Sequence, residues 1–171
     1  MKTKLIALFC SLISLCPSGA RAETNSIPNR LIDYNAFLVG AADVGRLRAE
    51  RRVTEEQFIQ MSSKPDTIVL DARSSEKYAQ LHICGAKHLS FPDFTAETLA
   101  RVIPSKSTRV LIYCNNNFLN APGAFPAKVQ AAALNIHTFN TLHNYGYTNV
   151  YELGPLIDIH RSKLVFEGTR Q

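Results

Sequence analysis

The segment Val110-Leu-Ile-Tyr-Cys-Asn-Asn-Asn117 decides the fold, because an apolar run ends abruptly in a polar turn. A run without alternation is typical of a strand that is covered on both faces of a sheet. Ile68-Val-Leu70 and Val150-Tyr-Glu-Leu153 have the same character. Helices are expected between and beside these strands, at residues 75–80, 95–102, 127–134 and 139–145. Alternating strands and helices favour an α/β fold with a mostly parallel central sheet and helices on both faces.

The first 22 residues have the parts of a secretory signal peptide. Met1-Lys-Thr-Lys4 is basic, residues 5–16 are apolar, and Ala20-Arg-Ala22 has the small-x-small cleavage pattern. The apolar run is shorter than the roughly 20 residues that span a membrane. We therefore predict cleavage after Ala22, export to the periplasm or out of the cell, and no membrane attachment of the mature chain.

The mature chain is expected to contain one domain. Residues 23–52 are predicted to form a polar leader and a partly ordered arm, and residues 53–171 the folded domain. Within that domain, Thr54-Glu-Glu-Gln57 has the form of a capping box, which predicts a helix of two to three turns that ends before Pro65.

The composition limits the classes of partner that the mature chain is expected to bind. Lys2, Lys4 and Arg21 leave with the signal peptide, which lowers the formal net charge from +5 to +2. A charge of this size gives no support for binding nucleic acid or an anionic membrane surface. No Cys-x-x-Cys or His-x-x-x-His spacing predicts a metal site, and no cofactor is expected.

Cys114 is the strongest candidate for chemistry, because ligands and reactive groups gather at the carboxyl ends of parallel strands. Asp71 follows another predicted strand at the same edge. The run Asn115-Asn-Asn117 tolerates tight turns, so its backbone N–H groups can point inward and stabilise a thiolate or a bound anion. The local sequence fits equally well a buried cysteine that fills space at the end of a strand.

Four segments, taken together and in order, resemble the signature of the rhodanese family. They are Leu70-Asp-Ala-Arg-Ser-Ser-Glu-Lys-Tyr78, His82-Ile-Cys-Gly-Ala-Lys-His-Leu89, Val110-Leu-Ile-Tyr-Cys114 and Tyr145-Gly-Tyr-Thr-Asn-Val-Tyr151. The resemblance covers about residues 54–153 and implies a single-domain, rhodanese-like α/β fold.

The resemblance also implies a mechanism. Cys114 would attack a small sulfur-containing anion such as thiosulfate, hold the sulfur as a persulfide, and pass it to a thiol or another thiophilic acceptor. Such chemistry needs a thiolate and groups that stabilise negative charge. The residues expected to bind the substrate form the loop after the cysteine: Asn115, Asn116, Asn117, Phe118, Leu119 and Asn120.

Three charged residues are expected to support this site. Arg73 and Glu76 are close enough in sequence to form an ion pair that fixes the loop beside Cys114. Asp71 is expected to cap the following helix. The lone histidines His82 and His88 are expected to pack or to form hydrogen bonds rather than to act in catalysis.

The loop departs from the family pattern, because residues 114–120 contain no arginine and no glycine. Gly146 follows Cys114 by 32 positions, a longer separation than in typical members. The additional residues, 118–133, are expected to form a flap or a short helix over the site. Lys128 in this segment is a candidate for the missing positive charge, with an ordinary surface lysine as the alternative.

Two other functions remain open. The altered loop fits a rhodanese-like binding or regulatory module that has lost turnover and recognises a protein partner. Cys84 replaces the proline usual in its turn, which leaves a thiol-redox protein using Cys84 and Cys114 as a third possibility. A disulfide needs α-carbons within roughly 7 Å. The family topology places Cys84 at the start of one strand and Cys114 at the end of another, on opposite edges of the sheet, so no native disulfide is expected.

Overall fold

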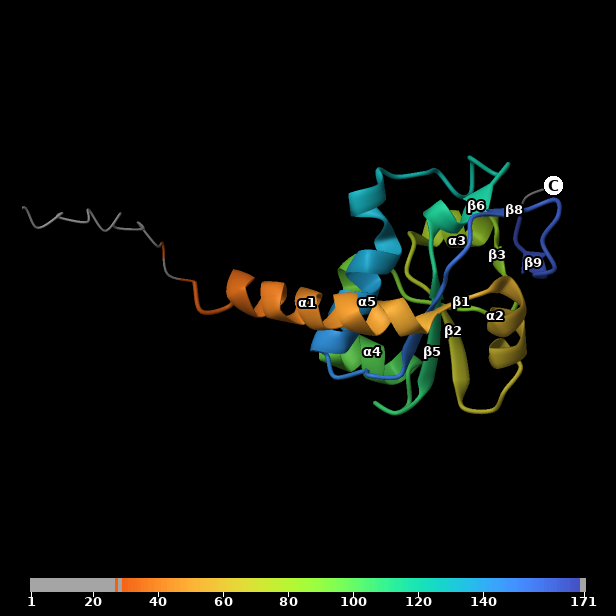
Figure 1. The fold of residues 1–171 in the computed structure, drawn as a ribbon. Coiled ribbons are helices and arrows are strands. Elements are labelled where there is room, and N and C mark those ends of the chain that lie inside the picture. The colour runs from red at the N-terminus through yellow and green to blue at the C-terminus, as the bar shows by residue number, and fades with distance from the viewer. Residues whose placement is uncertain (1–26, 28, 170–171) are drawn as a thin grey trace, which may run out of the picture. The chain divides into compact units, whose positions relative to one another are not determined.

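The computed structural model describes residue 27 and residues 29–169. The predicted signal peptide lies outside the described residues. The centre of the fold is a five-stranded parallel sheet with the order β1-β7-β5-β2-β4. Figure 1 labels three of these strands, β1, β2 and β5. The strands of the sheet are β1 (Arg52–Val53), β2 (Thr67–Asp71), β4 (Lys87–His88), β5 (Arg109–Tyr113) and β7 (Val150–Leu153). The three strands predicted from apolar runs are therefore confirmed.

The unbroken apolar runs have a structural reason, because both faces of the sheet are covered. In β2, Val69 packs in one hydrophobic cluster and Leu70 in the other. In β5, Leu111 and Ile112 divide in the same way. Successive side chains of a strand point to opposite faces, so a strand between two cores favours apolar residues on both of its faces.

Helices cover both faces, as predicted. One cluster contains residues of α1 (Tyr34–Arg51), α4 (Ala96–Val102) and α5 (Leu134–Asn144). The other contains Phe58 of α2 (Glu55–Ser62), and Tyr78 of α3 (Ser75–Gln80) packs against it. Three short 3₁₀ helices and two small sheets complete the described fold. They are η1 (Phe91–Asp93), η2 (Asn115–Asn117) and η3 (Gln130–Ala132), the antiparallel pair β3 (His82–Ile83) and β9 (Phe166–Glu167), and the parallel pair β6 (Phe118–Leu119) and β8 (Ile157–Asp158).

The capping box at Thr54 and two other predicted helices are confirmed. The Thr54 hydroxyl accepts a hydrogen bond from the backbone of Gln57, whose side chain accepts one from the Thr54 backbone, and α2 follows. The helices predicted at 75–80 and 95–102 are α3 and α4. None of the described helices combines the length and the apolar character needed to cross a membrane.

Helix α1 was not predicted, because residues 31–52 show no clear period. Only Gly40 and Val44 of this helix are buried, so a narrow stripe rather than a full face contacts α5 and β7. A side chain at position 40 would collide with the Asn144 side chain, which explains the glycine. The arm expected at residues 23–52 is therefore, from Tyr34 onward, a helix followed by the edge strand β1.

The prediction of a helix at 127–134 is wrong. The helix predicted at 139–145 is present but begins earlier, at Leu134. The structure has a 3₁₀ turn at η3 and then a single helix, α5. The side chain of Asn116 accepts a hydrogen bond from the backbone N–H of Lys128 (3.1 Å) and donates one to its carbonyl oxygen (2.7 Å). This pairing satisfies the backbone of Lys128 outside a helix and outweighs the helix propensity of the alanines.

Candidate functional site

Cys114 lies directly after β5, at the carboxyl edge of the sheet. Its side chain contributes to the wall of a pocket of about 440 Å³, although the residue is only 2% exposed. The pocket is lined by residues of α1, β1, the loop after Cys114, the segment before α5, α5 itself and the end of β7: Arg48, Arg52, Cys114, Asn116, Asn117, Phe118, Leu119, Ala127, Gln130, Ala133, Asn135, Ile136, Glu152, Leu153, Gly154 and Leu156.

Backbone N–H groups converge on the thiol. Asn116 of the loop and the first two residues of α5, Leu134 and Asn135, direct backbone N–H groups at the sulfur and lower its pKa. The first N–H groups of a helix have no partner inside the helix, and the N-cap residue Ala133 offers no side-chain acceptor. The first N–H groups of α5 therefore face the Cys114 thiol rather than a capping side chain. The positive end of the helix dipole also favours the thiolate there.

The pKa of the resting thiol is nevertheless raised above its ordinary value of 9.0. Burial is the largest cause, and the nearby Glu152 carboxylate adds to it, whereas the three N–H donors lower the pKa. Burial disfavours the charged form more strongly than these donors favour it. Cys114 is therefore a protonated thiol at neutral pH.

Asn117 holds the loop in place. Its side-chain oxygen accepts hydrogen bonds from the backbone N–H of Cys114 (2.9 Å) and the side-chain amide of Asn135 (3.2 Å). Its amide nitrogen donates to the carbonyl oxygens of Leu153 (2.8 Å) and Pro155 (3.1 Å). One buried side chain therefore connects the cysteine, the start of α5 and the end of β7.

The predicted loop residues separate into two groups. Asn116, Asn117, Phe118 and Leu119 line the Cys114 pocket. The others lie elsewhere: Asn115 lines a neighbouring hollow, and Asn120 adopts a left-handed backbone conformation with a φ of 64° and lowers the pKa of Asp158.

Lys128, the candidate cation, lines the neighbouring hollow together with Arg73 and is absent from the wall that contains Cys114. Its backbone is held by Asn116, while the residue itself is exposed. The inserted segment does border the pocket, through residues such as Gln130 and Ala133.

Two expectations about the supporting charges were wrong. Arg73 pairs with Asp71 rather than with Glu76, and both partners of this pair are buried. Glu76 is exposed and pairs with Lys77 at 3.1 Å. Ser74, not Asp71, caps α3. The guanidinium turns inward across the strand ends, where Asp71 is the only carboxylate that the described structure brings to it, while Glu76 lies on the solvent side of its helix.

The buried Asp71–Arg73 pair belongs to a larger hydrogen-bond network. Asp71 also accepts a hydrogen bond from the Tyr113 hydroxyl. Arg73 donates to the carbonyl oxygens of Leu81 (2.7 Å) and Ala124 (2.9 Å), and its guanidinium lies 4.2 Å from the ring centroid of Phe125. Ala124 and Phe125 belong to the inserted segment. Arg73 therefore fastens that segment to the sheet.

Sequence reasoning missed three charged residues of the pocket. Arg48 donates two hydrogen bonds to the Glu152 carboxylate, from Nε to Oε2 (2.8 Å) and from Nη2 to Oε1 (2.6 Å). Nε of Arg52 lies 3.0 Å from Oε1. A signal was available, because Glu152 interrupts an apolar strand and a buried carboxylate needs a cationic partner. The arginines could not be identified from it, because they lie in the segment expected to be a partly ordered arm.

Cys84 has no contact with this pocket. It is exposed, and its thiol donates a hydrogen bond to the Glu167 carboxylate (3.5 Å), which raises the pKa of Cys84. Both thiols are free. The histidines form hydrogen bonds, as expected: His82 Nδ1 lies 2.8 Å from the carbonyl oxygen of Tyr78, and His88 Nε2 lies 2.9 Å from that of Arg73.

Comparisons with known proteins agree with this architecture. Residues 54–154 match the family described as the Rhodanese-like domain. Among solved structures, the Rhodanese-like domain of the Alr3790 protein from Anabaena sp. is 18% identical, with a TM-score of 0.50 over 70% of this chain and 80% of that one.

Two other solved structures are similar. Protein hp1203 from Helicobacter pylori is 24% identical, with a TM-score of 0.45 over 70% of this chain and 91% of that one. A rhodanese with anions from E. coli is 23% identical, with a TM-score of 0.40 over 60% of this chain and 99% of that one. No curated protein matches the chain. The family match spans more than half of the chain, and the chain belongs to the rhodanese-like domain family.

Proposed function

We propose that the protein is a sulfurtransferase in which Cys114 carries a sulfane sulfur as a persulfide. The supporting observation is the convergence of three backbone N–H groups on a thiol that borders a pocket. Preorganised N–H donors stabilise negative charge on sulfur without reorganising during the reaction. The same donors would hold the thiolate, the transferred sulfur and the persulfide in turn.

The transfer has two steps. After losing its proton to solvent, Cys114 attacks the outer sulfur of a thiosulfate-like donor. A sulfur–sulfur bond forms to Cys114, the bond to the oxidised sulfur breaks, and sulfite leaves with that electron pair. An acceptor such as cyanide then attacks the outer sulfur of the persulfide. Thiocyanate leaves, and the Cys114 thiolate is restored.

Burial of the thiol favours a second function, a rhodanese-like binding module. The nucleophile is the thiolate, and the raised pKa keeps Cys114 protonated at neutral pH. The loop at residues 114–120 also lacks a basic residue that would stabilise the anion. A module of this kind would use the pocket to recognise a partner and would transfer no sulfur.

Thiocyanate formation from thiosulfate and cyanide separates the two functions. We expect activity that increases from pH 7 to pH 9 as the thiolate fraction rises, that is lost in Cys114→Ser, and that is retained in Cys84→Ser. Intact mass spectrometry after incubation with thiosulfate should show the gain of one sulfur atom on the wild-type chain. Absence of both signals at every pH would refute the sulfurtransferase, and a loss of two hydrogen atoms would point to a disulfide instead.

A further inference from the structure

We propose that a hollow between α2 and the start of β5 binds a nucleoside monophosphate. This α2–β5 hollow has a volume of about 450 Å³, which falls within the roughly 300–1,000 Å³ typical of sites for organic ligands. Residues of α1, β1, α2, β5, β7 and the turn after α2 line it: Glu50, Val53, Gln57, Gln60, Met61, Lys64, Arg109 and Tyr151. The inference does not depend on sulfur transfer.

The α2–β5 hollow lies at the other edge of the sheet from the thiol. Arg109 is the first residue of β5, whereas Cys114 follows the last. A strand rises about 3.3 Å per residue, so these two backbone positions are roughly 16 Å apart. The hollow shares no lining residue with the Cys114 pocket. A ligand bound here would therefore occupy a separate site.

Arg109 carries a positive charge that no carboxylate in the described part of the chain pairs with. It lies opposite Thr67 in the neighbouring strand, and its Nη1 is 3.5 Å from the threonine hydroxyl. Its Nε is buried and has no hydrogen-bond partner among the described residues. Buried donors are normally satisfied, and guanidinium groups bind phosphate with paired N–H groups. A phosphate in the hollow would supply the counter-charge that Arg109 lacks.

Lys64 adds a second cation to the same wall. Its backbone N–H donates to the carbonyl oxygen of Met61 (3.1 Å), which places Lys64 in the turn after α2. The residue is exposed, and its ammonium group forms no ion pair with any described residue. Glu50 is the single carboxylate among the lining residues. Two cations and one carboxylate give the hollow a net positive charge, which favours an anion.

The rest of the lining suits a flat ring with polar edges. Met61 and Tyr151 are partly exposed and, with Val53, form the apolar part of the wall. Aromatic side chains stack well with nucleobases, and methionine packs adaptably against rings. Within the described chain, the Gln60 side chain forms no hydrogen bond, and Gln57 uses only its side-chain oxygen, in the capping box. Their amide groups are therefore available to a polar ligand.

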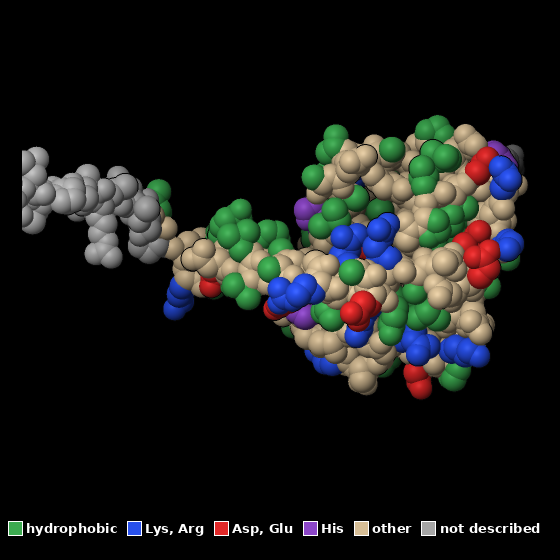
Figure 2. Space-filling view, viewed as in Figure 1, with side chains coloured by type: hydrophobic (Ala, Val, Ile, Leu, Met, Phe, Trp, Pro, Cys, Tyr) green, Lys and Arg blue, Asp and Glu red, His purple; other side chains and the backbone are tan. Residues whose placement is uncertain are grey.

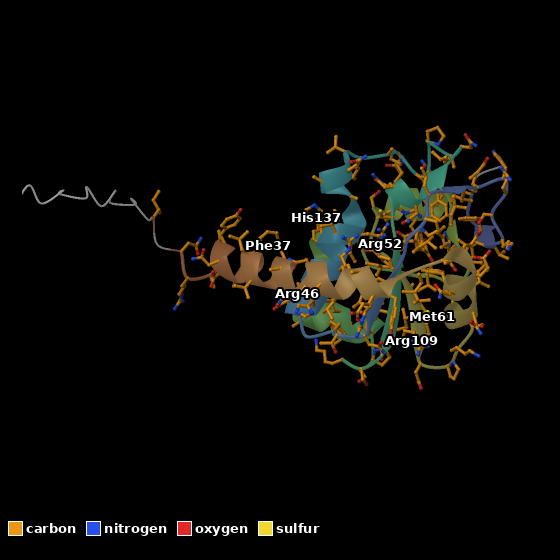
Figure 3. The ribbon with its side chains drawn as sticks, in the orientation of Figure 1. Phe37, Arg46, Arg52, Met61, Arg109 and His137 are labelled. Carbon is orange, nitrogen blue, oxygen red and sulfur yellow. The ribbon has the colours of Figure 1, made fainter. Side chains whose placement is uncertain are left out.

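A nucleoside monophosphate has a part for each of these groups. Its phosphate would bind Lys64 and Arg109, and its base would contact Met61 and Tyr151. Its ribose hydroxyls would donate to the Glu50 carboxylate. In Figure 2 basic side chains lie beside apolar ones at the place where Figure 3 labels Met61 and Arg109. Free phosphate would leave the apolar wall uncovered, and a neutral nucleoside would leave both cations without a counter-charge.

Calorimetry with adenosine monophosphate tests the proposal on the purified protein. Lys64→Ala is the first test variant, because an exposed side chain without an ion pair can be removed without disturbing the fold. Lys87→Ala is its matched control, since Lys87 is an exposed lysine of β4 that does not line the hollow. Arg109→Gln is the second test variant, and circular dichroism checks its fold. Arg52→Ala shows whether the nucleotide binds in the Cys114 pocket instead, because Arg52 lines only that pocket.

Two fragments separate the contributions of phosphate and base. Adenosine lacks the phosphate, and ribose 5-phosphate lacks the base. We expect Lys64→Ala and Arg109→Gln each to weaken binding of adenosine monophosphate by about tenfold, which corresponds to ~1.4 kcal/mol. Lys87→Ala and Arg52→Ala should leave it unchanged. Both fragments should bind more weakly than the whole nucleotide, and adenosine should bind equally to the wild type and to Lys64→Ala.

Three results would overturn the inference. The first is the absence of binding of adenosine monophosphate by the wild type. The second is binding of ribose 5-phosphate as tight as that of the nucleotide, which would show a simple phosphate site. The third is equal binding by Lys64→Ala and Lys87→Ala, or a loss in Arg52→Ala, which would place the nucleotide outside the α2–β5 hollow.

Discussion

Replacing Arg73 by methionine should lower the free energy of unfolding by about 3–5 kcal/mol. The Asp71–Arg73 pair is almost completely buried. Removing one partner of a buried ion pair costs about 3–5 kcal/mol, because the other charge stays desolvated and unpaired. Methionine retains most of the side-chain volume and its contact with Phe125, so little of the loss would come from a cavity. The carbonyl oxygens of Leu81 and Ala124 would also lose a donor.

Urea unfolding at pH 7 measures this change in the free energy of unfolding. The folded unit begins at Asp33 and includes the described residues up to Thr169. For a domain of about this size, each kcal/mol shifts Tm by roughly 2–4 °C. A loss of about 4 kcal/mol should therefore lower Tm by roughly 8–16 °C. Arg73→Lys keeps the charge and should lose less than Arg73→Met.

A double variant tests the reasoning. In Asp71→Asn/Arg73→Met no charge is left buried, so its stability should exceed that of Arg73→Met alone. A loss below about 1 kcal/mol in Arg73→Met would refute the view that the pair is desolvated and energetically coupled. So would a double variant that is less stable by the sum of both single losses.

Two further predictions concern the loop and alkaline pH. Asn117→Ala should cost about 1–3 kcal/mol in urea unfolding, because the buried N–H of Cys114 loses its acceptor. It should also slow thiocyanate formation, and unchanged kinetics would show that the loop does not depend on this side chain. Burial raises the pKa of Tyr113 well above its ordinary value of 10.0, so the unfolded state releases this proton at lower pH than the folded state. The stabilisation is therefore complete below pH 10 and is lost above it. Between pH 9 and pH 11 the free energy of unfolding should fall more steeply in the wild type than in Tyr113→Phe, and equal slopes would contradict this assignment.

Local sequence was sufficient for the frame of the fold. The apolar runs at 68–70, 110–113 and 150–153 predict central strands because a strand between two cores must be apolar on both sides. The capping residue Thr54 identifies a helix start because its hydroxyl group satisfies a backbone N–H group three residues away. Each of these properties is decided within a few residues. Cys114 at a strand end followed from the same pattern.

Only the tertiary structure decided what surrounds that thiol. Arg48 and Glu152 are 104 residues apart in sequence, and the N–H groups of Leu134 and Asn135 reach Cys114 only after the inserted segment has returned to the sheet. Helix α1 could not be predicted, because a helix that packs through a narrow stripe has no clear hydrophobic period in its sequence. Local patterns report which face of an element is buried. They do not report which distant charge or N–H group meets it, because that depends on how the packed elements bring separate parts of the chain together.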